Sequence, residues 1–137
     1  MVICYAYLWL AEHRQGREEG VKDRPCVIVL ARRNEADGET VVTVVPVTHT
    51  PPGDPEAAAE IAPATKRRLG LDDDRSWIIV SELNRFVWPD PDLRPVSVEQ
   101  LDRFDYGVLP PRLFRAVKVR LLLLHEAKKL QTIPRTS

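Results

Sequence analysis

Cys26-Val27-Ile28-Val29-Leu30 and Thr40-Val41-Val42-Thr43-Val44-Val45-Pro46-Val47-Thr48 decide the fold of this chain, together with the polar stretch between them. The first run is apolar and β-branched, which is typical of a strand buried on both faces. The second run also predicts a strand, and Pro46 near its end indicates an edge or a bulge. Asn34 and Asp37-Gly38 lie between the two runs and predict a hairpin turn. A strand, a turn and a second strand are therefore the firmest structural expectation.

Shorter patterned segments surround this hairpin. Apolar runs predict further strands at residues 2–10, 57–61, 76–81 and 86–88. Lys66-Arg67-Arg68-Leu69-Gly70 predicts a helical turn that ends at a left-handed glycine. The polar residues 12–22 show no apolar periodicity and predict a loop.

The C-terminal part, residues 97–130, is expected to be helical. Ser97 and Gln100 match a capping box, and Gly107 suits the position just past the end of that short helix. Pro110-Pro111 predicts the first turn of a longer helix that runs to about Leu130. The apolar stripe of this helix is wide enough to face both a core and a second surface, such as another subunit. The stripe consists of Leu113, Phe114, Val117, Leu121, Leu122, Leu123 and Leu124. We expect one domain, mainly β with C-terminal helices, in which residues 2–90 form a small barrel or half-open sheet.

Composition narrows the function classes. The chain has 137 residues, with 20 Lys and Arg against 20 Asp and Glu, so no overall charge attracts nucleic acid, although a local basic patch remains possible. Cys4 and Cys26 lack the spacing of a zinc site or a disulfide scaffold, and Cys26 is expected in the core. No metal or cofactor is expected. Without a run long enough to span a bilayer, the chain is expected to be soluble and cytoplasmic.

Two strand ends carry polar side chains suited to phosphate chemistry. Arg24 is held in extended conformation by Pro25, and a planar guanidinium at the start of a strand suits phosphate recognition; the alternative is a surface ion pair with Asp23 or a glutamate. Thr48 and His49 end the valine-rich strand, where a hydroxyl and an imidazole can bind a phosphate and move a proton. The alternative is that both residues simply cap the strand.

Three further segments of the chain contain acidic side chains. Glu18-Glu19 could supply a base or orient Arg24, or form a solvated charge run, and Ser81-Glu82 allow the same two interpretations. Asp72-Asp73-Asp74 lacks the alternation and the glycine of a Ca²⁺ loop, so we expect it to neutralise Lys66-Arg67-Arg68 instead. Motifs of serine hydrolases, P-loop proteins, dinucleotide-binding proteins and zinc proteases are missing from the sequence.

Taken in order, several of these segments resemble the PemK/MazF toxin family. The resemblance covers about residues 7–88 and extends to a PemK-like stretch at 106–112. It rests on Gly16-x-x-Glu19 followed by Lys22-Asp23-Arg24-Pro25-Cys26-Val27-Ile28-Val29-Leu30, on Val44-Val45-Pro46-Val47-Thr48, and on Gly70-Leu71 followed by Ser76-Trp77-Ile78-Ile79-Val80-Ser81-Glu82.

The resemblance implies an SH3-like small β-barrel of the PemK/MazF/CcdB type with terminal helices, working as a homodimer. It also implies metal-independent cleavage of single-stranded mRNA, restrained by a small antitoxin. Carried over by position, Arg24 and Thr48 match the catalytic arginine and threonine of the family. Glu19 matches its loop glutamate, with Glu18 as the alternative.

Such cleavage proceeds by attack of the RNA 2′-OH on the adjacent phosphorus, which needs a base, an acid and positive donors. Arg24 would stabilise transition-state charge, Thr48 would hold a phosphate oxygen, and His49 or Glu19 would be the base. Further RNA contacts are expected from Lys22, Ser81 and Glu82, and from Trp77, on whose ring a base could stack.

Two other functions remain open. A toxin of the same fold can act without catalysis by poisoning a protein such as gyrase through its C-terminal helix. A nucleic-acid-binding barrel would bind RNA in a salt-dependent manner without cleaving it.

Overall fold

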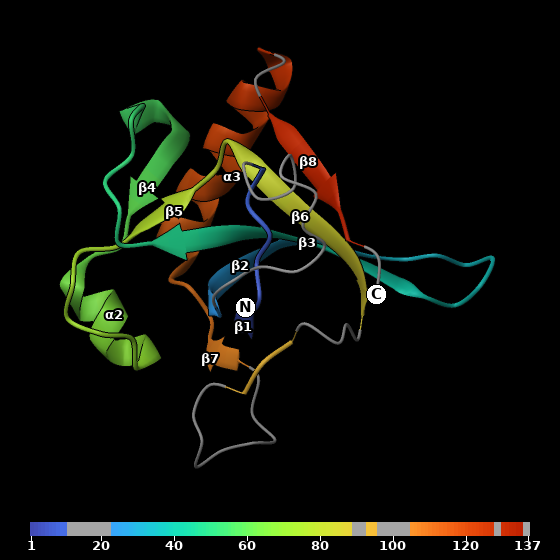
Figure 1. The fold of residues 1–137 in the computed structure, drawn as a ribbon, viewed down its shortest axis with the longest axis horizontal. Helices are drawn as coiled ribbons and strands as arrows, with labels where there is room; N and C mark the ends of the chain where they lie inside the picture. Colours follow the sequence, from blue (N-terminus) through green and yellow to red (C-terminus); the bar gives the residue numbers. More distant parts are fainter. Residues whose placement is uncertain (11–22, 89–92, 96–104, 128–129, 136–137) are drawn as a thin grey trace.

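The computed structural model describes residues 1–10, 23–88, 93–95, 105–127 and 130–135. These form a mainly antiparallel β-sheet with two α-helices, one of them C-terminal (Figure 1). In chain order the elements are β1 (Val2–Tyr5), β2 (Arg24–Arg33), β3 (Thr40–Thr48), η1 (Pro55–Ala57), β4 (Ala58–Glu60), α2 (Pro63–Leu69), β5 (Trp77–Ile79), β6 (Glu82–Trp88), β7 (Asp105–Gly107), α3 (Pro111–Glu126) and β8 (Gln131–Pro134).

The predicted hairpin is confirmed, and its strands β2 and β3 are the longest of the sheet. Its turn is closed by the Asn34 N–H, which donates to the Glu39 carbonyl at 2.7 Å, and Gly38 has a φ of 74°, a value that favours glycine. The register shifts between Ile28 and Leu30, so β2 carries a bulge there. The turn end of the hairpin projects beyond the rest of the sheet in Figure 1, and the last four residues of β2 are exposed.

β3 is the centre of the topology. It pairs with β2 along its length, with β6 through Thr40 to Val44, and with β5 through Val47 and Thr48. Pro46 lies between the β6 and β5 pairings, where a missing N–H costs no ladder hydrogen bond to either strand. The strand order is β4-β5-β3-β2-β1-β7; in addition, β6 pairs with β3, and β8 pairs with β6. Among the described residues, no pairing closes this sheet into a barrel.

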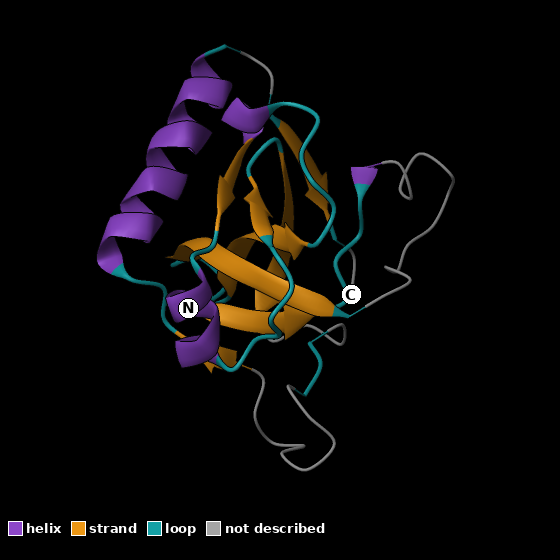
Figure 2. Cartoon of the chain, turned by 90° about the vertical axis from the view of Figure 1, so that its left-hand side faces the viewer, coloured by secondary structure: helices purple, strands orange, loops and turns teal. Residues whose placement is uncertain are grey.

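Two apolar clusters form the core. One packs Val27, Val45 and Ile78 of the sheet against Val117 and Leu124 of α3, and Figure 2 shows this helix running beside the sheet. The other gathers aromatic and aliphatic side chains that include Tyr5, Tyr7, Cys26, Val44 and Phe86. Cys26 is fully buried as predicted, and Cys4 is buried too; both are free thiols, and burial raises the pKa of each.

Several elements differ from the expectation in their bounds, and α3 ends at Glu126 rather than near Leu130. β1 ends at Tyr5 rather than at Leu10. Residues 105–107, expected at the end of a helix, form the strand β7 that pairs with β1, and the predicted capping box of Ser97 and Gln100 lies outside the described residues. The chain also returns after α3 as β8, parallel to β6. Only Ile133 of β8 is buried, and the strand sequence Gln-Thr-Ile-Pro contains no apolar run that would predict a strand.

A buried polar network joins the two ends of the chain to the sheet. Asn84 of β6 is fully buried; its Nδ2 donates to the Leu8 carbonyl at 2.8 Å, and its Oδ1 accepts from the Leu8 N–H at 2.9 Å. The same oxygen accepts from Nη1 of Arg135 at 3.0 Å, and that nitrogen also lies 3.0 Å from the Ala6 carbonyl. One asparagine therefore fixes both the segment after β1 and the segment after β8. In the described part of the chain, no helix has the length and apolarity needed to cross a membrane.

Candidate active site

The two predicted polar strand ends lie at the same end of the hairpin. Cys26 is paired with Pro46, and continuing this antiparallel register by two residues places Arg24 opposite Thr48. Both residues line a cavity of about 360 Å³. Among the described residues, the lining consists of Asp23, Arg24, Pro25, Val47, Thr48, His49, Thr50, Lys66, Leu71, Asp72 and Ser76.

Arg24 brings a free positive charge to this cavity. Its guanidinium carbon lies 4.9 Å from the centre of the Trp9 ring, a cation–π contact that holds the side chain in place. Its Nε is buried and has no hydrogen-bond partner among the described residues. Asp23 pairs instead with Nε of Arg94, at 3.5 Å, so the alternative of an Asp23–Arg24 ion pair is wrong. The guanidinium is therefore available for an anion.

Thr48 supplies a hydroxyl with an uncommitted proton. Its Oγ1 accepts a hydrogen bond from the Thr50 N–H at 3.1 Å, the turn that was the alternative interpretation of this segment. That bond uses one lone pair of the hydroxyl oxygen and leaves the hydroxyl proton free. Because no described residue accepts this proton, Thr48 can donate it to a phosphate oxygen. Capping the strand and binding a ligand are thus compatible roles for Thr48.

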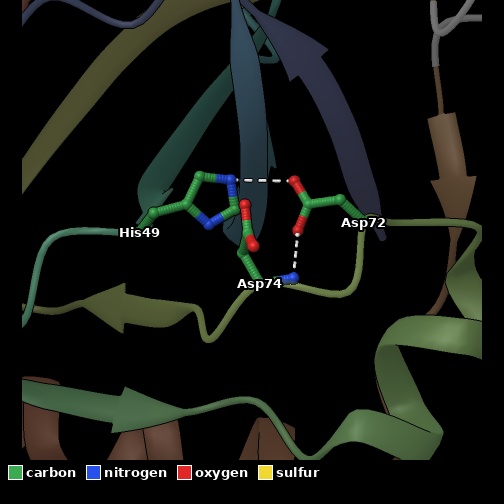
Figure 3. A group of neighbouring side chains, drawn as sticks. All are labelled: His49, Asp72 and Asp74. Carbon is green, nitrogen blue, oxygen red and sulfur yellow. Dashed lines mark hydrogen bonds and ion pairs between the residues drawn. The ribbon is translucent and has the colours of Figure 1, made fainter.

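His49 is held by contacts on both ring nitrogens. Nε2 lies 2.8 Å from Oδ2 of Asp72 (Figure 3). Nδ1 lies 3.1 Å from both the Ser76 hydroxyl and the Arg75 carbonyl. Asp72 on one side of the ring and Ser76 with Arg75 on the other therefore fix the position of the imidazole. Because Nδ1 can donate to the Arg75 carbonyl or accept from the Ser76 hydroxyl, the ring can take part in proton transfer in either direction.

Lys66 anchors the loop that carries Asp72. Its buried ammonium donates to Oδ1 of Asp72 at 2.5 Å, to Oγ of Ser76 at 2.6 Å and to the Asp74 carbonyl. The prediction that the acidic stretch neutralises neighbouring cations is confirmed for Lys66. Burial alone would raise the pKa of Asp72, but the Lys66 hydrogen bond and charge, with His49, hold it below its usual range. The network therefore stabilises the fold at neutral pH and loses this contribution as the pH falls through that lowered pKa.

The same residues include a group with metal-ligand chemistry. One ligand atom each of His49, Asp72 and Asp74 lies within 4.8 Å of the others (Figure 3). Both oxygens of Asp72, however, are already engaged by Lys66 and His49. A divalent cation on Asp72 would therefore lie against a buried ammonium, so we interpret this cluster as an ion-pair network.

The other predicted site residues do not line the cavity or are not described. Trp77 is only 8% exposed and its ring lies 5.0 Å beneath the Arg75 guanidinium, so it packs as core. Oε1 of Glu82 accepts from the Tyr7 hydroxyl and the Leu10 N–H, and the Ser81 carbonyl accepts from the Gln131 N–H. Glu82 and Ser81 thus hold the fold together away from this cavity. Glu19, with its alternative Glu18, and Lys22 lie outside the described residues.

Lys66, Asp72 and Ser76 also line this cavity, although the sequence patterns did not predict them as site residues. A signal was present, because Ser76 directly precedes a predicted strand. Trp77 of that strand pairs with Thr48, which brings the loop before it against His49.

Comparison of the chain with protein-family models, with the curated proteins and with the solved structures found no match. The function is therefore inferred from the chemistry of the site.

Proposed function

We propose that this protein is an endoribonuclease that cleaves single-stranded RNA by attack of the 2′-OH, and that the open sheet is a variant of an SH3-like barrel. The observation that carries the proposal is the single cavity that joins Arg24, Thr48 and His49 at one end of the β2–β3 hairpin. An unpaired guanidinium, a donor hydroxyl and a carboxylate-held imidazole are the groups that phosphodiester cleavage needs.

In the proposed step, the 2′ oxygen forms a bond to phosphorus while the bond from phosphorus to the 5′ oxygen breaks. The proton of the 2′-OH passes to a base, and the leaving oxygen takes a proton, which yields a 2′,3′-cyclic phosphate and a 5′-OH. Arg24 stabilises the negative charge on phosphorus and Thr48 holds a non-bridging oxygen. His49, held in position by Asp72 at Nε2, supplies the proton to the leaving group. Glu19 remains the proposed base.

The biological role proposed with this chemistry is that of a toxin in a toxin–antitoxin pair. Such a protein would act on mRNA in the cytoplasm as a homodimer and would be restrained by a small cognate antitoxin. None of these steps requires a metal ion, because protein side chains supply both the positive charge and the proton transfer.

A second candidate function is supported by the outer face of α3. Val119, Leu122 and Leu123 are 50%, 61% and 60% exposed, and a groove of about 700 Å³ runs beside them. An exposed apolar helix face of this kind suits a protein partner. A non-catalytic toxin would depend on these side chains and would tolerate the loss of Arg24 and Thr48.

A Thr48→Val variant tests the proposed role of the hydroxyl. Valine keeps the shape of threonine but removes the donor, so we expect cleavage of a long single-stranded RNA in EDTA to slow roughly 10²-fold. The wild type should produce fragments with cyclic phosphate and 5′-OH ends. Thr132→Val, at an exposed position of β8, is the matched control and should cleave as the wild type does. Equal activity of Thr48→Val and Thr132→Val would contradict the assignment, and intact RNA with folded wild-type protein would favour the protein-binding toxin.

A further inference from the structure

A second, separate hollow lies at the other end of the same hairpin. It has a volume of about 740 Å³, and its lining contains three arginines against one glutamate. We call it the arginine groove; its lining is Leu30, Arg32, Arg33, Asn34, Glu35, Val41, Thr43 and Arg85. None of these residues lines the cavity of Arg24 and Thr48.

The bulge in β2 creates this groove. Leu30 is paired with Thr43, Arg32 with Val41, and Thr43 in turn with Arg85 of β6, so these side chains share one face of the sheet. Ile28 is paired with Val44 on the opposite face. An unbroken alternation would have placed Leu30 and Arg32 on the face of Ile28. The extra residue reverses this and places Arg32 on the face of Thr43 and Arg85. Arg33, the next residue of β2, is paired with Thr40 on the opposite face and lines the groove near the turn.

The positive charge of the groove has no internal partner. Neither Arg32 nor Arg33 nor Arg85 makes a side-chain hydrogen bond or an ion pair with any residue that the structure describes. The nearby Asp37 is engaged by the turn itself, where it accepts from Asn34 Nδ2 and from the Glu39 N–H. Arg32 and Arg85 therefore present unpaired guanidiniums on one face, Arg33 adds a third to the lining, and each has a fork that matches a phosphate.

We propose that the arginine groove binds the phosphate backbone of single-stranded RNA outside the cleavage cavity. This inference rests on the proposed function for the choice of RNA. β2 runs from Arg24 at the cavity to Arg32 in the groove, which corresponds to about 26 Å at ~3.3 Å per residue. Arg24 precedes the bulge and lies on the face of Ile28, whereas Arg32 lies on the opposite face, so an RNA strand that contacts both must pass around an edge of the sheet.

Charge and shape favour RNA over an acidic peptide as the occupant. A docked peptide helix needs an apolar groove, whereas the apolar side chains in this lining are limited to Leu30 and Val41. Arginine planes, in contrast, can both pair with phosphates and stack on unpaired bases. Glu35 in the lining repels an anionic ligand. Removing its charge should therefore strengthen RNA binding, whereas removing the arginine charges should weaken it.

The test measures binding without cleavage. The probe is a fluorescent single-stranded 2′-O-methyl oligoribonucleotide of about 16 nucleotides, which has no free 2′-OH to attack. The variants are the triple substitution Arg32→Gln, Arg33→Gln and Arg85→Gln, and the single substitution Glu35→Gln. The matched control is the triple substitution Arg112→Gln, Arg115→Gln and Lys118→Gln, which removes three exposed charges from α3.

We expect the groove triple variant to bind at least 10-fold more weakly, with the slope of log K against log salt reduced by about 2, since each phosphate contact on a single strand contributes about 0.7. Glu35→Gln should bind more tightly, and the α3 control should change affinity by less than about 3-fold. Equal weakening by both triple variants, no binding by the wild type, or displacement of the probe by polyglutamate at equal charge would overturn the proposal. Because the probe cannot be cleaved, a groove that binds is distinguishable from a cavity that fails to cut.

Discussion

Arg24→Ala is expected to cleave single-stranded RNA about 10²–10³-fold more slowly than the wild type, which is the usual loss when one transition-state donor is removed. The reason is that Arg24 is the one guanidinium that the described residues bring to the cavity lining, and it makes no ion pair with any of them. Arg24→Lys keeps the charge but loses the fork that grips two phosphate oxygens. We therefore expect it to recover only part of the rate, in single-turnover cleavage with saturating protein.

Two controls separate this chemistry from a loss of structure. Arg24 packs on Trp9, so thermal unfolding of each variant is measured beside its cleavage rate. Arg112→Ala removes an exposed arginine from α3, outside this cavity, and should leave the rate unchanged. Near-wild-type cleavage by a folded Arg24→Ala protein would show that the cavity is not the catalytic site.

Asn84→Leu is expected to lower the free energy of unfolding by about 3–5 kcal/mol. Leucine has a similar size but cannot form hydrogen bonds with the Leu8 backbone or with the Arg135 guanidinium. These groups are buried and would lose their hydrogen-bond partner. A loss of this size is a large part of the ~5–15 kcal/mol that stabilises a typical domain. Urea unfolding followed by fluorescence would measure it.

A second variant shows whether the cost comes from stranded polar groups. The double substitution Asn84→Leu with Arg135→Met removes the buried guanidinium along with its partner, so it should be less destabilised than Asn84→Leu alone. Gln131→Leu changes an exposed residue of the adjacent strand and should stay within about 0.5 kcal/mol of the wild type. A loss below about 1 kcal/mol for Asn84→Leu would mean that the network does not hold the chain ends.

The parts of the fold that follow local rules could be predicted from the sequence. The β2–β3 hairpin, the left-handed Gly70 that ends α2 and the start of α3 at Pro111 are all encoded within a few residues. β7 and β8 could not be predicted, because they are short and are formed only by pairing with the distant strands β1 and β6. The bulge in β2 was missed for a similar reason, since a strand sequence shows alternation but not an extra residue in the ladder.

The candidate site was partly predictable for the same physical reason. Arg24 begins β2 and Thr48 ends β3, so the antiparallel ladder brings them together at the open end of the hairpin regardless of the rest of the fold. Lys66 and Asp72 are six residues apart, and their sequence predicted only that the acidic stretch neutralises the neighbouring cations. Their importance comes from the burial of the Lys66 ammonium against Ser76, which depends on packing that no local pattern reveals.

The most direct test of the central claim compares one RNA with the same strand carrying 2′-deoxy sugars throughout, each incubated with the wild-type protein in EDTA. Loss of the 2′-OH removes the proposed nucleophile while leaving the phosphates that Arg24 and Thr48 would bind. The account predicts that only the RNA is cut, with cyclic phosphate ends on the fragments. Cleavage of both strands, or of neither by a folded protein, would contradict it.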